Sequence, residues 1–225
     1  MWVSEIFQSV QGEGMHVGVP SAFLRTSGCN LRCSFCDTPY TSWEPEGDER
    51  TTESLIDELS GFGIEHIVIT GGEPTLVAEI VPLTSELAGR GHVITIETAG
   101  TVFRPLAAGL ISLSPKLKNS IPFGTAWERR HDERRHRPEV IRQWLAGYCC
   151  QFKFVVDKPE DIEEVEKYLS EFPEAAAHTV FLMPQGTTIE ALHERMEWMT
   201  PLAEARGWKV SPRRHIELFG NTRGT

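Results

Sequence analysis

The 225-residue chain contains no apolar run of the roughly 18 residues that a membrane-spanning helix needs. It also has no low-complexity tract, no sequence repeat and no linker-like stretch that would divide it. These absences argue against a membrane protein and favour one globular domain over residues 1–225. The 40% hydrophobic and 24% charged residues are ordinary for a soluble enzyme.

Positive charge is scarce. The 22 lysines and arginines face 32 aspartates and glutamates, which gives a net charge of −10. Because contacts to phosphates need a basic patch, we expect no direct nucleic-acid partner. Residues 127–137 are the local exception, with five arginines and two histidines. A charge run of this kind usually forms a solvated loop or helix face.

Cysteine is also scarce, but it is concentrated. Three of the five cysteines fall at Cys29, Cys33 and Cys36, with the spacing C-x3-C-x2-C. The odd count and the crowding argue against disulfides and favour a reduced, cytoplasmic protein. Cys149 and Cys150 begin an apolar run and are expected to be small buried residues.

The three clustered thiols predict an iron–sulfur site. A structural zinc site would need a fourth Cys or His at short spacing, and the chain has no second C-x2-C pair. A [4Fe–4S] cluster normally takes four cysteines, so three would leave one iron open. The open iron indicates that a small molecule binds there, which makes the cluster part of a reaction.

Strand-like and helix-like segments alternate along the rest of the chain, with one strand before the cysteines and five or six after them. This order predicts βα units and a mostly parallel sheet. A complete eight-fold barrel takes about 250 residues, so we expect an α/β fold with a partial, open βα barrel. The expected strands are 21–25, 66–70, 92–97, 109–114, 151–156, 179–183 and 208–211, and the expected helices are 52–62, 75–89, 138–145, 160–169 and 189–206.

Polar or glycine-rich residues follow four of these strands, at 71–74, 97–100, 114–116 and 184–186. In α/β proteins the carboxyl ends of parallel strands form the ligand-binding edge. The Gly71-Gly72-Glu73-Pro74 segment alone also fits a plain βα turn. Together with the cysteine loop, the four strand ends predict a small-molecule site.

The cysteine spacing after the first strand and Gly-Gly-Glu-Pro after the second resemble the radical S-adenosylmethionine (SAM) superfamily. The resemblance implies that SAM completes the open iron through its amino and carboxyl groups. It further implies that an electron from the cluster cleaves SAM to a 5′-deoxyadenosyl radical, while the protein keeps the site dry and aligned.

More specific motifs are similar to the 7-carboxy-7-deazaguanine synthase family over almost the whole chain. They are Glu5–Gly14, Arg25, Asp37-Thr38 directly after Cys36, and the segment 220–224. The resemblance implies a lyase that contracts the ring of 6-carboxy-5,6,7,8-tetrahydropterin with loss of ammonia, in queuosine and deazapurine biosynthesis. It also implies that SAM is regenerated, that a flavodoxin- or ferredoxin-type protein supplies electrons, and that the chain forms a homodimer.

The same resemblance assigns residues. Cys29, Cys33 and Cys36 are expected to hold the cluster, and the Thr38 hydroxyl to hold Mg²⁺, which prefers oxygen ligands. The residues expected at SAM are Phe35, Asp37, Gly72, Glu73, Glu97, Ser114, Pro115, Lys116 and Gln185. Those expected at the pterin are Val10, Gln11, Gly12, Glu13, Arg25, Thr70 and His215, with His215 closing over it.

Alternatives stay open at this point. Arg25 also fits a strand-end surface residue, and Thr38 a turn hydroxyl. A glycyl-radical activase shares the cysteine spacing, and a cluster-bearing interaction module would have no catalytic role. Residues 44–50 replace part of a helix expected after the cluster and would leave the substrate side more open. Relatives whose terminal carboxylate meets the substrate end differently from Thr225.

Overall fold

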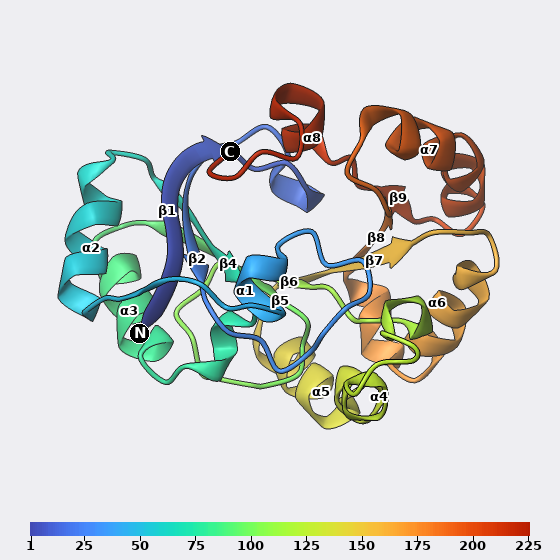
Figure 1. Cartoon of the computed structure of the whole chain (residues 1–225), viewed down its shortest axis with the longest axis horizontal. Coiled ribbons are helices and arrows are strands. Elements are labelled where there is room, and N and C mark those ends of the chain that lie inside the picture. Colours follow the sequence, from blue (N-terminus) through green and yellow to red (C-terminus); the bar gives the residue numbers. More distant parts are fainter.

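One nine-stranded sheet runs through the computed structural model, which describes residues 1–225 (Figure 1). The strand order is β3-β1-β2-β4-β5-β6-β7-β8-β9, and every pair from β2 to β9 is parallel. The strands are β1 (Trp2–Val10), β2 (Pro20–Thr26), β3 (Asp48–Glu49), β4 (His66–Gly71), β5 (Val93–Thr98), β6 (Leu110–Leu113), β7 (Cys150–Val156), β8 (Thr179–Pro184) and β9 (Lys209–Val210).

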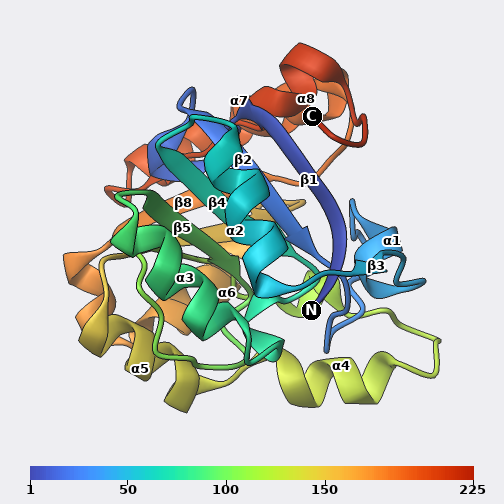
Figure 2. The same cartoon turned by 90° about the vertical axis from the view of Figure 1, so that its left-hand side faces the viewer.

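Helices lie around the outside of the curved sheet, and the sheet does not close on itself (Figures 1 and 2). This arrangement confirms the predicted α/β fold with an open, mostly parallel sheet. The helices are α1 (Pro39–Ser42), α2 (Thr52–Gly61), α3 (Ile80–Gly89), α4 (Glu128–Arg135), α5 (Pro138–Gly147), α6 (Asp161–Ser170), α7 (Ile189–Glu204) and α8 (Arg214–Phe219). None of them combines the length and hydropathy that crossing a membrane requires.

The central strands are buried on both faces, which explains their continuous apolar sequences. Strand β7 shows how the two faces differ. Phe152 and Phe154 are fully buried and stack with ring centroids 5.8 Å apart in the main core. The alternate residues Lys153 and Val155 point to the opposite face and line an internal cavity. The strands therefore supply the helix-packed core with one face and the site with the other.

Strand β1 is a correction to the sequence analysis, which expected one strand before the cysteines. β1 pairs antiparallel with β2 over almost its full length. Its residues are mostly half-buried and include Ser4, Glu5 and Gln8, so it has no continuous apolar run to reveal it. The strand ends beside the start of β2, so the loop at Gln11 lies at the end of the sheet opposite the cysteines and reaches the same cavity from there.

Several predicted boundaries also change. The helix expected over 75–89 is a short 3-10 turn (Pro74–Leu76) followed by α3, because Val77 is extended between them. Residues 127–137 contain α4, which agrees with the solvated helix face expected there. Cys150 is buried as expected, but Cys149 is exposed. Helix α8 was not predicted, and the segment 44–50 contains β3, which pairs with the start of β1.

Candidate active site

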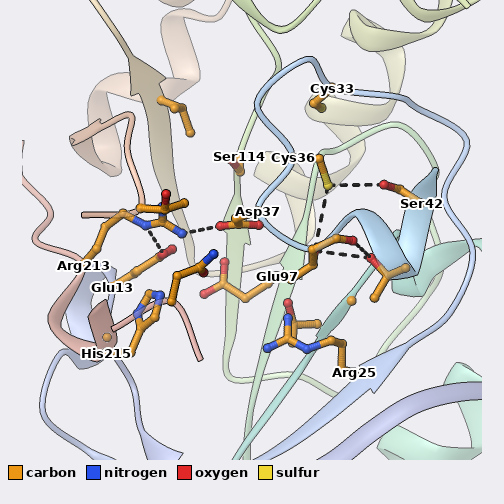
Figure 3. Close-up of a pocket in the computed structure, with 18 of the residues that line it drawn as sticks. Glu13, Arg25, Cys33, Cys36, Asp37, Ser42, Glu97, Ser114, Arg213 and His215 are labelled. Carbon is orange, nitrogen blue, oxygen red and sulfur yellow. Dashed lines mark hydrogen bonds and ion pairs between the residues drawn. The ribbon is translucent and has the colours of Figure 1, made fainter. Parts of the chain in front are cut away.

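A cavity of about 500 Å³ lies where the cysteine loop meets the carboxyl ends of the parallel strands (Figure 3). Its volume lies within the range of small-molecule sites. The lining includes every residue predicted for the site except Glu73 and Pro115. The predicted residues that line it are Val10, Gln11, Gly12, Glu13, Arg25, Cys29, Cys33, Phe35, Cys36, Asp37, Thr38, Thr70, Gly72, Glu97, Ser114, Lys116, Gln185 and His215.

The Gly71-Gly72 turn connects β4 to the cysteine loop through the main chain. The N–H of Gly72 donates to the carbonyl of Thr26 at 3.1 Å, and the N–H of Glu73 donates to the carbonyl of Gly28 at 2.9 Å. A Cβ at position 72 would collide with the carbonyl of Gly28 and approach that of Thr41. Glycine is therefore required here by close backbone contact.

Glu73 faces away from the cavity and holds this turn in place. Its carboxylate accepts hydrogen bonds from the hydroxyls of Thr98 at 2.7 Å and Thr75 at 2.8 Å, and from the N–H of Ala99 at 2.9 Å. Burial raises the pKa of the Glu73 carboxyl, and these hydrogen bonds oppose the rise. The structure therefore gives Glu73 a positioning contact between the ends of β4 and β5.

The three cysteines of the loop carry free thiols that border the cavity. Burial raises the pKa of the Cys29 thiol to about 12 and that of the Cys33 thiol to about 11. The N–H of Leu31 lies 3.4 Å from Cys29 Sγ, and the Ser42 hydroxyl lies 3.2 Å from Cys36 Sγ. Donors aimed at sulfur are the outer-shell contacts that metal-bound thiolates accept.

This donor set fits a [4Fe–4S] cluster. A cube takes each thiolate at a different iron, so its cysteines need not meet at one point. In the structure no three His, Cys, Asp or Glu side chains converge closely enough to surround a single metal ion. The separated thiols around one cavity thus suit a cluster better than a mononuclear site.

A buried lysine that the sequence analysis missed joins the two sets of predicted binding residues. Lys153 Nζ lies 2.6 Å from Glu13 Oε2 and 2.8 Å from Glu97 Oε2, and its side chain is 3% exposed. Burial lowers the pKa of the Lys153 ammonium, but the two carboxylates together outweigh burial and raise it. The sequence did offer one sign of this residue, because a lysine within the mostly apolar strand 150–156 indicates a buried charge that needs a partner.

Arg213 is a second missed residue and lies on the other side of Glu13. Its guanidinium contacts Glu13 Oε1 at 3.3 Å, donates to the carbonyl of Gly186 at 2.6 Å and pairs with Asp37 (Figure 3). Burial raises the pKa of the Glu13 carboxyl, but Lys153 and Arg213 outweigh it and hold that pKa well below its usual range. Glu13 is therefore ionised although it is enclosed.

The C-terminal segment packs against strand β1 and the loop after it, at the cavity. The N–H of Arg214 donates to the carbonyl of Gly12 at 2.9 Å, which places His215 against the Gly12 backbone. Arg223 pairs with Glu5 at 3.0 Å and Glu46 at 2.9 Å. The lining includes four residues of this tail, Asn221, Thr222, Arg223 and Thr225. The C-terminal segment thus covers the side that the sequence analysis left open.

Arg25 and Thr38 both reach the cavity. Arg25 lies opposite Thr70 in the β2–β4 ladder, and its Nε contacts Glu5 Oε2 at 2.6 Å. The Thr38 oxygen accepts a hydrogen bond of 3.3 Å from the Thr41 hydroxyl. That contact leaves lone-pair capacity on the Thr38 oxygen for a cation. The cavity as a whole offers carboxylates, hydroxyls and cations to a polar ligand beside three thiols.

Comparison with known proteins agrees with this geometry. The model of the Radical SAM superfamily matches residues 23–145, more than half of the chain. The chain belongs to the radical SAM superfamily. Membership implies a [4Fe–4S] cluster and SAM as cofactors and a source of electrons, which confirms that part of the sequence prediction.

Within this superfamily, the chain belongs to the 7-carboxy-7-deazaguanine synthase family. It is 44% identical to that synthase from Rhodopirellula baltica, over 99% of this chain and 88% of the relative. It is 40% identical to the one from Halobacterium salinarum, over 97% and 90%. The crystal structure of QueE from Escherichia coli superposes with a TM-score of 0.69 at 27% identity, covering 95% of this chain and 94% of that one. The predicted family is confirmed.

Proposed function

We propose that the chain catalyses the reaction its relatives are named for and forms 7-carboxy-7-deazaguanine. The substrate is 6-carboxy-5,6,7,8-tetrahydropterin, whose ring is contracted with release of ammonia. The observation that carries the proposal is one cavity in which the cysteine loop faces Gln11, Glu13 and Arg25. Lys153 bonds the carboxylate assigned to the pterin to the carboxylate assigned to SAM, so the two ligands would lie side by side.

Cys29, Cys33 and Cys36 would hold the cluster. When bound, the cluster and SAM supply a 5′-deoxyadenosyl radical, and the protein contributes binding and alignment. Gly72 offers its backbone at the end of β4, and Glu97, Ser114, Lys116 and Gln185 offer polar side chains at three further strand ends. The Lys116 ammonium already donates to the Ser114 hydroxyl at 2.8 Å, which orients both groups at the rim.

Glu13 would accept hydrogen bonds from the amino-pyrimidinone edge of the pterin, because Lys153 and Arg213 keep it ionised. Arg25 would pair with the substrate carboxylate, since Glu5 occupies its Nε and leaves its terminal nitrogens unbonded. Burial lowers the pKa of His215, so at neutral pH it would cover the substrate as an uncharged ring. The tail over the cavity favours a small molecule over the protein loop that a glycyl-radical activase must accept.

We further propose that Mg²⁺ binds at the Thr38 hydroxyl, with water and substrate oxygens completing its shell. The support is the position of Thr38 on the cavity wall, two residues after Cys36. A homodimer, a cytoplasmic location and a single domain remain predictions from the sequence. The exposed Leu218 and Phe219 on α8 offer one apolar contact for a second copy. Size-exclusion chromatography of the wild type measures the oligomeric state.

The proposal is tested by an anaerobic assay of the reconstituted protein with SAM, dithionite, Mg²⁺ and 6-carboxytetrahydropterin. We expect mass spectrometry to detect 7-carboxy-7-deazaguanine. Cys33→Ala is the matched control, since it should lose the cluster and all turnover. Cleavage of SAM by the wild type without conversion of the pterin would overturn the substrate assignment.

A further inference from the structure

Three arginines without a carboxylate partner gather at the outer side of the cysteine loop. Arg32 belongs to the loop itself, and Arg130 and Arg134 lie one turn apart on α4. No carboxylate lies within 4.0 Å of any of the three, which sets them apart from their neighbours. The other arginines of this region are paired, Arg129 with Glu133, Arg135 with Asp132 and Glu164, and Arg137 with Glu139.

Two of these arginines, Arg32 of the loop and Arg130 of α4, stack on the ring of Trp127. The guanidinium carbon of Arg32 lies 4.2 Å from the centroid of the Trp127 ring, and that of Arg130 lies 4.9 Å from it. Stacking of this kind fixes the position of a guanidinium without neutralising its charge. We call Arg32, Trp127, Arg130 and Arg134 the arginine patch.

The arginine patch lies directly on the chain that carries the predicted cluster ligands. Arg32 Nη1 donates to the carbonyl of Cys29 at 2.8 Å, and Arg134 Nη1 approaches the carbonyl of Asn30 at 3.5 Å. Ser34, between the second and third cysteines, is exposed to solvent. One side of the loop thus faces the cavity and the other faces the protein surface.

Helix α4 is fixed to the loop, so the patch is held in place. His131 is fully buried between the two arginines of the helix. Its Nδ1 accepts from the N–H of Arg32 at 3.1 Å, and its Nε2 bonds the Ser120 hydroxyl at 2.9 Å. Phe123, just before α4 in the chain, is 68% exposed. Arginine and exposed aromatic residues are the types enriched where proteins bind one another.

We propose that the arginine patch is the docking surface for an acidic electron-transfer protein that reduces the cluster. The net charge of −10 would repel an acidic partner elsewhere, whereas the unpaired arginines attract it to the point nearest the cysteines. Complexes between electron-transfer proteins bury little surface, so a patch of four side chains can serve as the centre of such an interface. The inference rests on the cluster assigned above and is independent of the pterin assignment.

The proposed step transfers one electron from the partner to the cluster, and no covalent bond forms or breaks. For a flavodoxin, the anionic flavin hydroquinone is oxidised to the neutral semiquinone, and the cluster gains that electron. No proton has to cross the interface. A donor seated on the arginine patch approaches the outer side of the loop, so the substrate cavity stays closed by the C-terminal tail during electron transfer.

The test compares the wild type with Arg130→Glu/Arg134→Glu and with a control, Lys167→Glu/Lys209→Glu. The control lysines are exposed and unpaired and change the net charge equally. Each reconstituted protein is mixed anaerobically with reduced flavodoxin, frozen at set times, and the reduced cluster is counted by electron paramagnetic resonance. We expect about tenfold slower reduction of the patch variant, with a weaker dependence on salt, and an unchanged control. Dithionite should reduce all three proteins equally.

Equal rates for the patch variant and the control would overturn the proposal. If the charge-reversed variant binds less iron than the wild type, Arg130→Gln/Arg134→Gln replaces it in the test. We expect flavodoxin to reduce this variant more slowly than the wild type, by a smaller factor. An unchanged rate would contradict the proposal. Binding of a single-stranded RNA at the patch, with flavodoxin reduction unaffected, would assign the surface to nucleic acid and overturn the proposal. A wild type that flavodoxin reduces but that leaves the pterin unconverted would overturn the proposed function alone.

Discussion

At the scale of single residues, Lys153 controls the charge state of the cavity. Lys153→Met would leave Glu13 and Glu97 facing one another without the ammonium that bonds both. Breaking a buried ion pair by removing one partner destabilises the folded protein by about 3–5 kcal/mol. Because Glu13 and Glu97 also lose the contact that positions them for the two ligands, we expect kcat/KM to fall by at least about a hundredfold. Lys153→Arg keeps the charge and should lose less. Steady-state assays with SAM and pterin varied in turn measure the effect, and an unchanged kcat/KM in Lys153→Met would contradict the bridging role.

Thr38 tests the magnesium proposal at the same scale. Thr38→Ala removes the one hydroxyl proposed to bind the cation, while Thr38→Ser keeps it. Because water can replace one ligand of Mg²⁺, we expect activity to survive but to need about tenfold more Mg²⁺ for half-saturation. Titration of activity against Mg²⁺ measures this, and identical curves for wild type and Thr38→Ala would remove Thr38 from the metal site.

At the scale of elements, the contact between the end of β4 and the cysteine loop depends on Gly72. In Gly72→Ala the new methyl group would meet the backbone carbonyls of Gly28 and Thr41, which cannot move aside as a side chain can. We expect a loss of about 2–4 kcal/mol in the free energy of unfolding and a lower iron content after reconstitution. Gly61→Ala in α2 is the control, because a Cβ there meets nothing and alanine favours a helix. A Gly72→Ala variant with the same iron content and the same free energy of unfolding as the wild type would show that the contact is not required.

Three neighbouring strands are joined by a buried histidine. His66 on β4 bonds the Ser21 hydroxyl of β2 at 2.7 Å and the Thr95 hydroxyl of β5 at 2.9 Å, with the His16 ring edge-on to it. Burial, with a smaller contribution from His16, lowers the pKa of His66 from 6.5 to about 4. Between these values the unfolded chain binds a proton that the folded chain does not, so stability falls as pH falls.

We therefore expect the free energy of unfolding to decrease by a few kcal/mol between pH 6.5 and pH 4, at about 1.4 kcal/mol per pKa unit. His66→Gln removes the titrating group and should lose that part of the pH dependence. His131, whose pKa burial also lowers to about 4, and His215, whose pKa burial lowers as well, still titrate in the variant and contribute to the remaining slope. Urea unfolding at several pH values in this range measures the free energy of unfolding of the wild type and of His66→Gln. The same pH dependence in both proteins would contradict the account.

Most elements were predictable because their patterns are local. The apolar run 66–70 and the capped helix from Thr52 predict β4 and α2 almost to the residue. Strand β1 was missed because its half-buried, mixed sequence shows neither an apolar run nor a clean alternation. The break at Val77 was missed because Arg104 donates to the carbonyls of Thr75 and Leu76 just before it, and no local pattern reports such a contact.

At the scale of the whole molecule, the site is assembled from segments more than two hundred residues apart. The motifs near residues 5–14 and 220–224 suggested binding residues, but only the fold shows that Arg223 reaches Glu5 and Arg214 reaches Gly12. Lys153 and Arg213 escaped prediction for the same reason, since each is identified by partners distant in sequence. Sequence motifs thus located most of the cavity wall, and the structure supplied the charges that join its parts.

The central claim is that the pterin is converted while SAM is held and used again, as the family resemblance implies, in a cavity that brings both sets of binding residues together. The most direct measurement supplies pterin in large excess over SAM and counts 7-carboxy-7-deazaguanine, 5′-deoxyadenosine and remaining SAM in the same anaerobic reaction. The account predicts more product than SAM, with SAM recovered intact and little 5′-deoxyadenosine. Product that stops at one equivalent of SAM, with equal release of 5′-deoxyadenosine, would contradict it.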